Sequence, residues 1–184
     1  MNQIFIHLAS GFEEIEAVTI IDVLRRAGLT AIIVSVTGNL IVKGAHDIEI
    51  KADLLFENAD YSKGEMIVLP GGMPGAKNLD NHNGLKAKIN EFFKNGKYLA
   101  AICAAPLVLG NMGILLWKKA VCYPGYESYL TGSEIHDTPF IVDNKIITGR
   151  GVGAALQFSL EIVRIAKGDE LASKLSNAML VGTD

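Results

Sequence analysis

Cysteine is scarce in this chain, which has only Cys103 and Cys122 among 184 residues. Two thiols cannot build the disulfide framework of a small secreted domain, and neither has the Cys or His neighbours of a zinc site. We therefore expect a reducing, cytoplasmic setting and no bound metal.

Long hydrophobic runs and basic tracts are also missing. No segment offers the roughly 18 consecutive apolar residues that a membrane-spanning helix needs. The formal net charge is −3, so we expect neither nucleic acid nor an anionic membrane as a partner. The length and the 49% share of hydrophobic residues suit a full core, and we expect a single domain over residues 1–184.

Short apolar runs alternate with helical patterns along the chain. Strands are expected at 4–9, 30–37, 66–69, 98–102 and 120–123, hairpins at 40–50 and 140–148, and helices at 14–27, 85–94, 151–166 and 170–179. This alternation predicts an α/β fold with an open, mostly parallel sheet and helices on both faces. Such sheets bind ligands at the carboxyl ends of their strands, so the loops 10–14 and 70–75 should converge with Cys103.

The stretch 98–106 carries the strongest functional signal, because an apolar strand runs directly into the start of a helix. Cys103 lies at the turn, where a nucleophile elbow places its reactive side chain. Backbone N–H groups and the positive end of the helix dipole favour a thiolate there, which predicts a lowered pKa for Cys103. The alternative is a small buried side chain without chemistry, as free cysteine often is.

Glu16 falls among the apolar positions of the first predicted helix, one turn before Ile20 and two before Val23. A carboxyl group in an apolar stripe is desolvated, which raises its pKa. If it faces Cys103, a protonated Glu16 can donate a hydrogen bond to the sulfur, and the two groups titrate as a coupled pair. The alternative is a solvated carboxylate that complements the dipole at the helix start.

Two glycine-rich segments follow predicted strands. Gly71 and Gly72 allow close approach of the backbone to a ligand, and their N–H groups, with that of Ala104, would stabilise the oxyanion of a carbonyl attacked by Cys103. A turn that simply needs glycine is the alternative. The segment 149–153 is only faintly like a dinucleotide loop and follows a hairpin, so we interpret it as a tight turn and expect no cofactor.

Four motifs closely resemble those of the ThiJ/PfpI family and, within it, the subgroup of the Parkinsonism-associated deglycase. In the family's order they are Gly11-Phe-Glu-Glu-Ile-Glu16, Leu69-Pro-Gly-Gly72 with Gly75-Ala-Lys-Asn-Leu79, Ala100-Ala-Ile-Cys-Ala104 and Thr148-Gly-Arg-Gly151. The resemblance covers residues 4–181. It implies a flavodoxin-like fold and a homodimer.

The resemblance also implies roles for individual residues. Cys103 would be the nucleophile, readily oxidised to a sulfinic acid, and Glu16 its protonated partner. The backbone N–H groups of Gly72 and Ala104 would form the oxyanion site. Activities described for family members are glyoxalase, protein or nucleotide deglycase, chaperone and oxidative-stress sensor.

The chain departs from this subgroup beside the expected site. Members with glyoxalase activity have a histidine where this sequence has Tyr123, and a phenol is a poor proton shuttle near neutral pH. His46 replaces an arginine that approaches the neighbouring subunit's site. The candidates for substrate contacts are Tyr123, Arg150, Gly71, Arg26 and His46.

These observations support two main functional hypotheses. The first is a cysteine-dependent enzyme that acts on reactive aldehydes or glycated adducts, weakened by the replacement of the histidine. The alternative is an oxidative-stress sensor or chaperone-like protective protein in which Cys103 is the oxidation target. A purely structural protein with an ordinary thiol is a third hypothesis.

Overall fold

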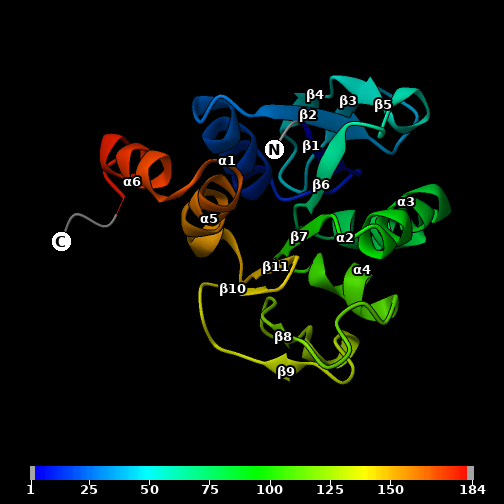
Figure 1. Cartoon of the computed structure of the whole chain (residues 1–184). Coiled ribbons are helices and arrows are strands. Elements are labelled where there is room, and N and C mark those ends of the chain that lie inside the picture. The colour runs from blue at the N-terminus through cyan, green and yellow to red at the C-terminus, as the bar shows by residue number, and fades with distance from the viewer. Residues whose placement is uncertain (1–2, 182–184) are drawn as a thin grey trace.

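The computed structural model describes residues 3–181 (Figure 1), so the ends of the expected 1–184 domain lie outside the described residues. Its main sheet has seven strands in the order β10-β11-β7-β6-β1-β2-β5. All of them pair in parallel except β10, which is antiparallel to β11. The strands are β1 (Gln3–Leu8), β2 (Thr30–Ser35), β5 (Leu54–Leu55), β6 (Gly64–Leu69), β7 (Tyr98–Ile102), β10 (Phe140–Asp143) and β11 (Ile146–Gly149).

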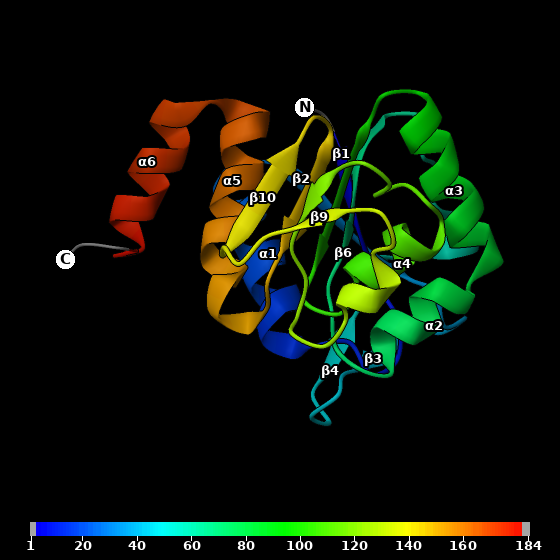
Figure 2. The same ribbon diagram turned by 90° about the horizontal axis from the view of Figure 1, so that it is seen from below.

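Helices cover both faces of this sheet (Figures 1 and 2). One face carries α1 (Glu14–Arg26), α5 (Ala155–Lys167) and α6 (Asp169–Ala178), and the other carries α2 (Gly75–Asn81), α3 (Asn83–Lys94) and α4 (Pro106–Asn111). Alternation along β1 explains the two cores, because Ile4, Ile6 and Leu8 pack on the α1 side while Phe5 packs with Phe92 on the other. The expected flavodoxin-like α/β fold is confirmed.

The order of the strands creates a switch point at the middle of the sheet. After β1 the chain adds β2 and β5 on one side, and it then returns to place β6 on the other side of β1. The loops that follow β1 and β6 therefore leave the same edge of the sheet, and they are bonded to each other there, since the Glu13 N–H donates to the Gly71 carbonyl at 2.9 Å. The candidate site lies at this edge.

The hairpin expected at residues 40–50 forms a separate two-stranded sheet. Its strands β3 (Ile41–Lys43) and β4 (Glu49–Lys51) are antiparallel. The hairpin is attached to the loop after β1 by a bridge between Phe12 and Gly44 and by the Gly11 N–H, which donates to the Lys43 carbonyl at 2.8 Å. On this side the edge strand of the main sheet is instead β5, which the sequence pattern does not predict.

The prediction of a strand at 120–123 is wrong beyond Ala120. Only β8 (Lys119–Ala120) forms, and it pairs with β9 (Glu134–Ile135) in a second small sheet. The next backbone donors have other acceptors, since the Val121 N–H donates to Thr148 Oγ1 at 3.0 Å and the Tyr123 N–H to the Cys103 carbonyl at 2.8 Å. These bonds draw the segment across the carboxyl edge of the main sheet.

Two helices also differ from expectation. Helix α2 was not predicted, because its Gly75 start after Pro74 looks like a loop. The helix expected from residue 151 begins as the 3₁₀ turn η3 (Val152–Ala154), and α5 follows it. The remaining 3₁₀ turns are η1 (Phe56–Asn58) and η2 (Glu127–Tyr129).

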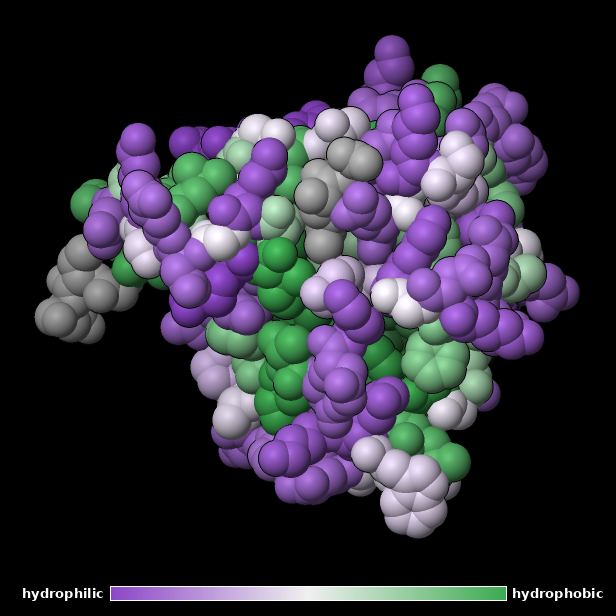
Figure 3. Space-filling view, viewed as in Figure 1, coloured by the Kyte–Doolittle hydropathy of each residue, from purple (hydrophilic) through white to green (hydrophobic). Residues whose placement is uncertain are grey.

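The surface is mainly hydrophilic on the face shown in Figure 3, with a strip of hydrophobic side chains over β10 and the adjoining flank of α5. Within residues 3–181, no helix is both long and apolar enough to cross a bilayer.

Candidate functional site

Cys103 lies at a sharp turn between β7 and α4. Its φ of 64° is positive, which is rare for a residue other than glycine. The turn is fixed on both sides, because the Cys103 N–H donates to the Gly149 carbonyl at 2.9 Å and the Cys103 carbonyl accepts from the Tyr123 N–H at 2.8 Å. The predicted elbow is therefore confirmed, and its strained conformation is maintained by neighbouring loops.

Glu16 enters the same space from the first turn of α1 and is fully buried. Its Oε2 accepts a hydrogen bond from the Gly71 N–H at 2.8 Å, and its own N–H donates to Glu13 Oε2 at 2.7 Å. Its Oε1 is buried, and its carboxyl group interacts with the side chain of Cys103. The prediction that Glu16 is desolvated is confirmed, and the solvated alternative is wrong.

Gly71 shows how closely the carboxyl and the thiol approach each other. A Cβ atom on Gly71 would lie 2.5 Å from the Cβ of Cys103 and 2.8 Å from Oε2 of Glu16. Such contacts leave no room for a side chain. Glycine is therefore required at position 71 for α1 and the turn at Cys103 to bring the carboxyl and the thiol together.

The pKa values of this pair reflect their common burial. Burial raises the pKa of Glu16 to about 7, and the hydrogen bond from the Gly71 N–H, which lowers the pKa, offsets only part of this rise. Burial, followed by the charge of Glu16, raises the pKa of Cys103 to about 12. The expected lowering of the thiol pKa is thus wrong in direction, because desolvation and a neighbouring carboxylate outweigh the backbone N–H groups.

Gly72 and Ala104 act on the sulfur through their backbone. The N–H groups of both residues interact with Cys103 and lower its pKa. Gly72 has a φ of 91°, and a Cβ there would lie 2.3 Å from the Glu13 nitrogen. Gly72 therefore adopts the positive φ that the turn requires, and its N–H interacts with the sulfur. This brings together the three loops that the topology predicts to converge.

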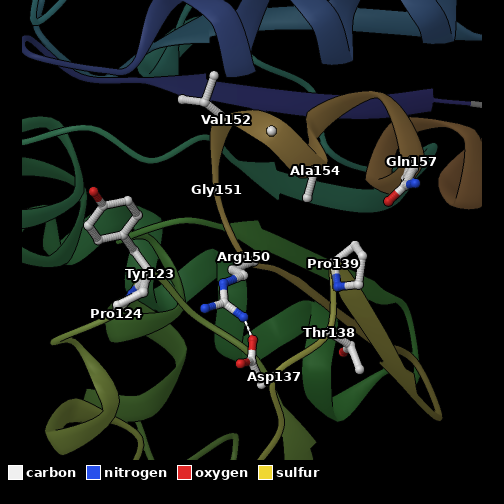
Figure 4. Close-up of a pocket in the computed structure, with 11 residues that line it drawn as sticks. Tyr123, Pro124, Asp137, Thr138, Pro139, Arg150, Gly151, Val152, Ala154 and Gln157 are labelled. Atoms are coloured by element: carbon white, nitrogen blue, oxygen red, sulfur yellow. Dashed lines mark ion pairs between the residues drawn. The ribbon is translucent and has the colours of Figure 1, made fainter. Parts of the chain in front are cut away.

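A cavity of about 590 Å³ lies on the other side of Gly151 from the thiol. Its lining includes Tyr123, Arg150 and Gly151 (Figure 4). A Cβ atom on Gly151 would lie 3.3 Å from the ring of Tyr123 and 4.0 Å from Cys103 Sγ. Cys103 itself is 8% exposed, and Gly151 is the lining residue that lies next to its sulfur.

Arg150 forms an ion pair with Asp137 at the wall of the cavity (Figure 4). Arg150 is one of the candidates for substrate contact that the sequence indicates, whereas no sequence pattern indicates Asp137. Asp137 lies in the segment between β9 and β10 and belongs to no motif, and only the fold places it against Arg150. The hydrogen bond from the Arg150 N–H to the Pro139 carbonyl, at 2.9 Å, holds the two segments together.

Two other candidates for substrate contact lie away from the cavity. Arg26 ends α1, ten residues after Glu16 and about 15 Å farther along a helix axis, and it pairs with Asp22 on the surface. His46 is 71% exposed in its side chain, and its Nδ1 lies 2.8 Å from Glu14 Oε2. Neither residue lines the cavity, so the fold does not bring them to the site within their own chain.

His46 also belongs to a cluster of potential metal ligands. Glu13, Glu14 and His46 offer ligand atoms within 4.8 Å of one another. Both carboxylates are already engaged, Glu13 by the N–H of Glu16 and Glu14 by His46. These bonds account for the cluster, and we assign no metal to it.

Fold and site together define a protein of the DJ-1/PfpI class, and residues 2–165 match the model of the DJ-1/PfpI family. The chain belongs to this family. It is 36% identical to Arabidopsis thaliana Protein DJ-1 homolog B over 98% of its own length, and it spans 42% of that longer protein.

Two further comparisons are informative. Over 89% of the chain and 87% of the relative, it is 30% identical to a Caenorhabditis elegans protein named glutathione-independent glyoxalase DJR-1.2. The solved structure of oxidised Toxoplasma gondii DJ-1 is similar with a TM-score of 0.94 and 34% identity, covering 99% of this chain and 100% of that chain.

Replacing Glu16 tests how the pair shares its charge. Glu16→Gln removes the carboxylate that raises the pKa of Cys103, so we expect this pKa to fall by about one unit or more. Alkylation of Cys103 at pH 7 should then accelerate roughly tenfold. In the wild type, the carboxylate ionises as pH rises through about 7 and opposes the thiolate. The rate should therefore rise less steeply with pH above 7 in the wild type than in the variant.

The measurement is the rate of iodoacetamide labelling of Cys103 against pH, followed by mass spectrometry of its peptide. Glu14→Gln is the matched control, because Glu14 is also a buried carboxyl on α1 but acts on His46 rather than on Cys103. An unchanged or higher Cys103 pKa in Glu16→Gln would contradict the interpretation.

Proposed function

We propose that this protein is a cysteine-dependent enzyme that acts on reactive aldehydes, such as α-oxoaldehydes or glycated adducts. The observation that carries the proposal is the buried Glu16 carboxyl, with a pKa of about 7, beside the Cys103 thiol. A base with this pKa suits proton transfer near neutral pH. The similarity to a relative named as a glyoxalase supports the same class of reaction.

In the proposed reaction the Cys103 sulfur bonds to the aldehyde carbon, and the thiol proton passes to Glu16. The carbonyl electron pair moves to the oxygen, where the N–H groups of Gly72 and Ala104 stabilise it until Glu16 returns the proton. Glu16 then transfers a proton from the former aldehyde carbon to the adjacent carbon, and the hydroxyl proton on the first carbon passes to the oxygen on the second, which yields a thioester. Water hydrolyses the thioester, so the net reaction is oxoaldehyde plus water to hydroxy acid.

Turnover of methylglyoxal tests this proposal. We expect formation of lactate by the wild type, loss of activity to the blank in Cys103→Ser, and a decrease in kcat of about 10²–10⁴ in Glu16→Gln. Lactate is measured enzymatically after removal of the protein. Cys122→Ser is the matched control and should retain activity. Equal lactate formation by the wild type and Cys103→Ser would end this proposal.

A second function is favoured by the contact between the buried Glu16 carboxyl and the Cys103 side chain. A protonated Glu16 would donate a hydrogen bond to an oxygen on oxidised Cys103. Tyr123 in place of the expected histidine also removes a base from the site. We therefore propose an oxidative-stress sensor or protective protein as the alternative, with Cys103 converted to a sulfinic acid by two equivalents of peroxide.

Peptide mass spectrometry after mild treatment with hydrogen peroxide checks this alternative. We expect two added oxygens on Cys103 before any oxidation of Cys122, because only Cys103 has both an acid partner and two N–H donors. Glu16→Ala should shift the Cys103 product toward the sulfonic acid. Oxidation of both thiols at the same rate would remove the support for a sensor.

We also propose a homodimer, formed through α1 and the β3–β4 hairpin. Ile15 and Val18 on α1 and Ile48 in the hairpin are exposed apolar side chains. The two elements are adjacent, since His46 contacts Glu14. A second copy that covers these side chains would bury an apolar surface that water otherwise contacts.

Sedimentation velocity of the wild type and of Val18→Asp measures the oligomeric state. We expect a dimer for the wild type and a shift toward monomer for the variant, because the new carboxylate would be desolvated in the interface. The control is Trp117→Gln, which changes an exposed apolar residue on another part of the surface. A wild type that sediments as a monomer, or a variant that stays dimeric, argues against this interface.

A further inference from the structure

The cavity beside Cys103 is larger than a three-carbon aldehyde needs. Its volume of about 590 Å³ lies within the range of about 300–1,000 Å³ that accommodates drug-sized ligands. Much of its lining is small or apolar, from Pro124, Pro139, Val152 and Ala154. A substrate whose carbonyl lies at the thiol therefore has space for a substantial second part.

The charged lining of this cavity consists of one cation and one anion, Arg150 and Asp137. They pair with each other (Figure 4), and their side chains are 40% and 80% exposed. Ion pairs in contact with solvent contribute little stability, whereas a guanidinium binds a carboxylate with two parallel hydrogen bonds. A carboxylate on a ligand can therefore take the place of Asp137 at little cost.

The backbone holds Arg150 at a fixed place relative to the thiol. The Cys103 N–H donates to the carbonyl of Gly149, and the Arg150 N–H donates to the carbonyl of Pro139. Gly151, on the other side of Arg150, is the position whose Cβ would lie 4.0 Å from Cys103 Sγ. The backbone of Arg150 is thus fixed directly beside Gly151, the part of the cavity wall that faces the sulfur.

Space on both sides of the ion pair lets the anion exchange without repacking. Arg150, Asp137 and Pro124 also line a second cavity of about 220 Å³, so the pair separates two open volumes. Asp137 released from Arg150 would turn into solvent-filled space.

We propose that this cavity selects carbonyl substrates that carry a carboxylate, with Arg150 as the residue that binds the carboxylate and Asp137 as its resident counter-ion. The proposal rests on the aldehyde-directed function proposed above and adds the charge and size of the substrate. An aryl oxoaldehyde with a carboxylate on the ring combines these properties.

The first test uses the charge of an alkylating reagent and needs no turnover. The rates of Cys103 alkylation by iodoacetate and iodoacetamide are compared by peptide mass spectrometry, and their ratio is normalised to that of N-acetylcysteine. We expect Arg150→Gln to lower this ratio by about three- to tenfold, Asp137→Asn to raise it, and Arg150→Lys to restore part of it. Arg164→Gln, which alters an exposed arginine paired with Asp169, should leave the ratio unchanged.

The second test compares turnover of 4-carboxyphenylglyoxal and phenylglyoxal. The wild type should favour the carboxylate compound in kcat/KM, and Arg150→Gln should remove this preference mainly by raising KM. If neither compound is turned over, the proposed enzyme function fails, and the alkylation ratio still decides the role of Arg150. An unchanged ratio in Arg150→Gln, with the fold intact by circular dichroism, overturns the inference.

Discussion

A thiol and a carboxyl group compete for one negative charge in a buried space, and the surrounding backbone is arranged around this competition. Two adjacent anions with little water would repel strongly, so ionisation of Cys103 depends on the protonation of Glu16. The protein supplies three N–H groups, from Gly71, Gly72 and Ala104. They offset part of the desolvation of the two groups.

The fold explains how these groups meet although they are distant in the sequence. Glu16 comes from the helix after β1, the glycines follow β6, and Cys103 follows β7. These strands are neighbours in the sheet and run in parallel, so their carboxyl ends lie at one edge. The chemistry is therefore a product of the strand order, and a change in one loop acts on groups contributed by the others.

Much of this arrangement could be predicted from the sequence because it follows from local rules. Glu16 occupies an apolar position of an amphipathic helix, which places it in the core regardless of what it contacts. Cys103 follows an apolar strand and precedes Pro106, so the turn is marked in the sequence itself. The direction in which its pKa shifts does not follow from this local pattern. It depends on the depth of burial and on the charge of Glu16, a residue distant in sequence, and both are properties of the whole fold.

Other features depend on contacts that no local pattern records. The segment 121–123 has strand-like composition, yet its donors bond to Thr148 and Cys103. Asp137 lines the cavity in a segment whose Pro139 carbonyl accepts from the Arg150 N–H. Arg26 is in the same helix as Glu16, but the rise of the helix carries it away from the site.

The hydrogen bond between Arg150 and Pro139 joins two parts of the molecule whose sequences can change to different extents during evolution. The reacting groups are supplied by tightly packed loops in which even a methyl group on Gly71 is excluded. The anion of the cavity wall, Asp137, comes instead from an exposed segment outside the main sheet. The charge of the cavity wall can thus change by surface mutation while the packed loops around Cys103 stay the same, so close homologues with identical packed loops need not present the same cavity.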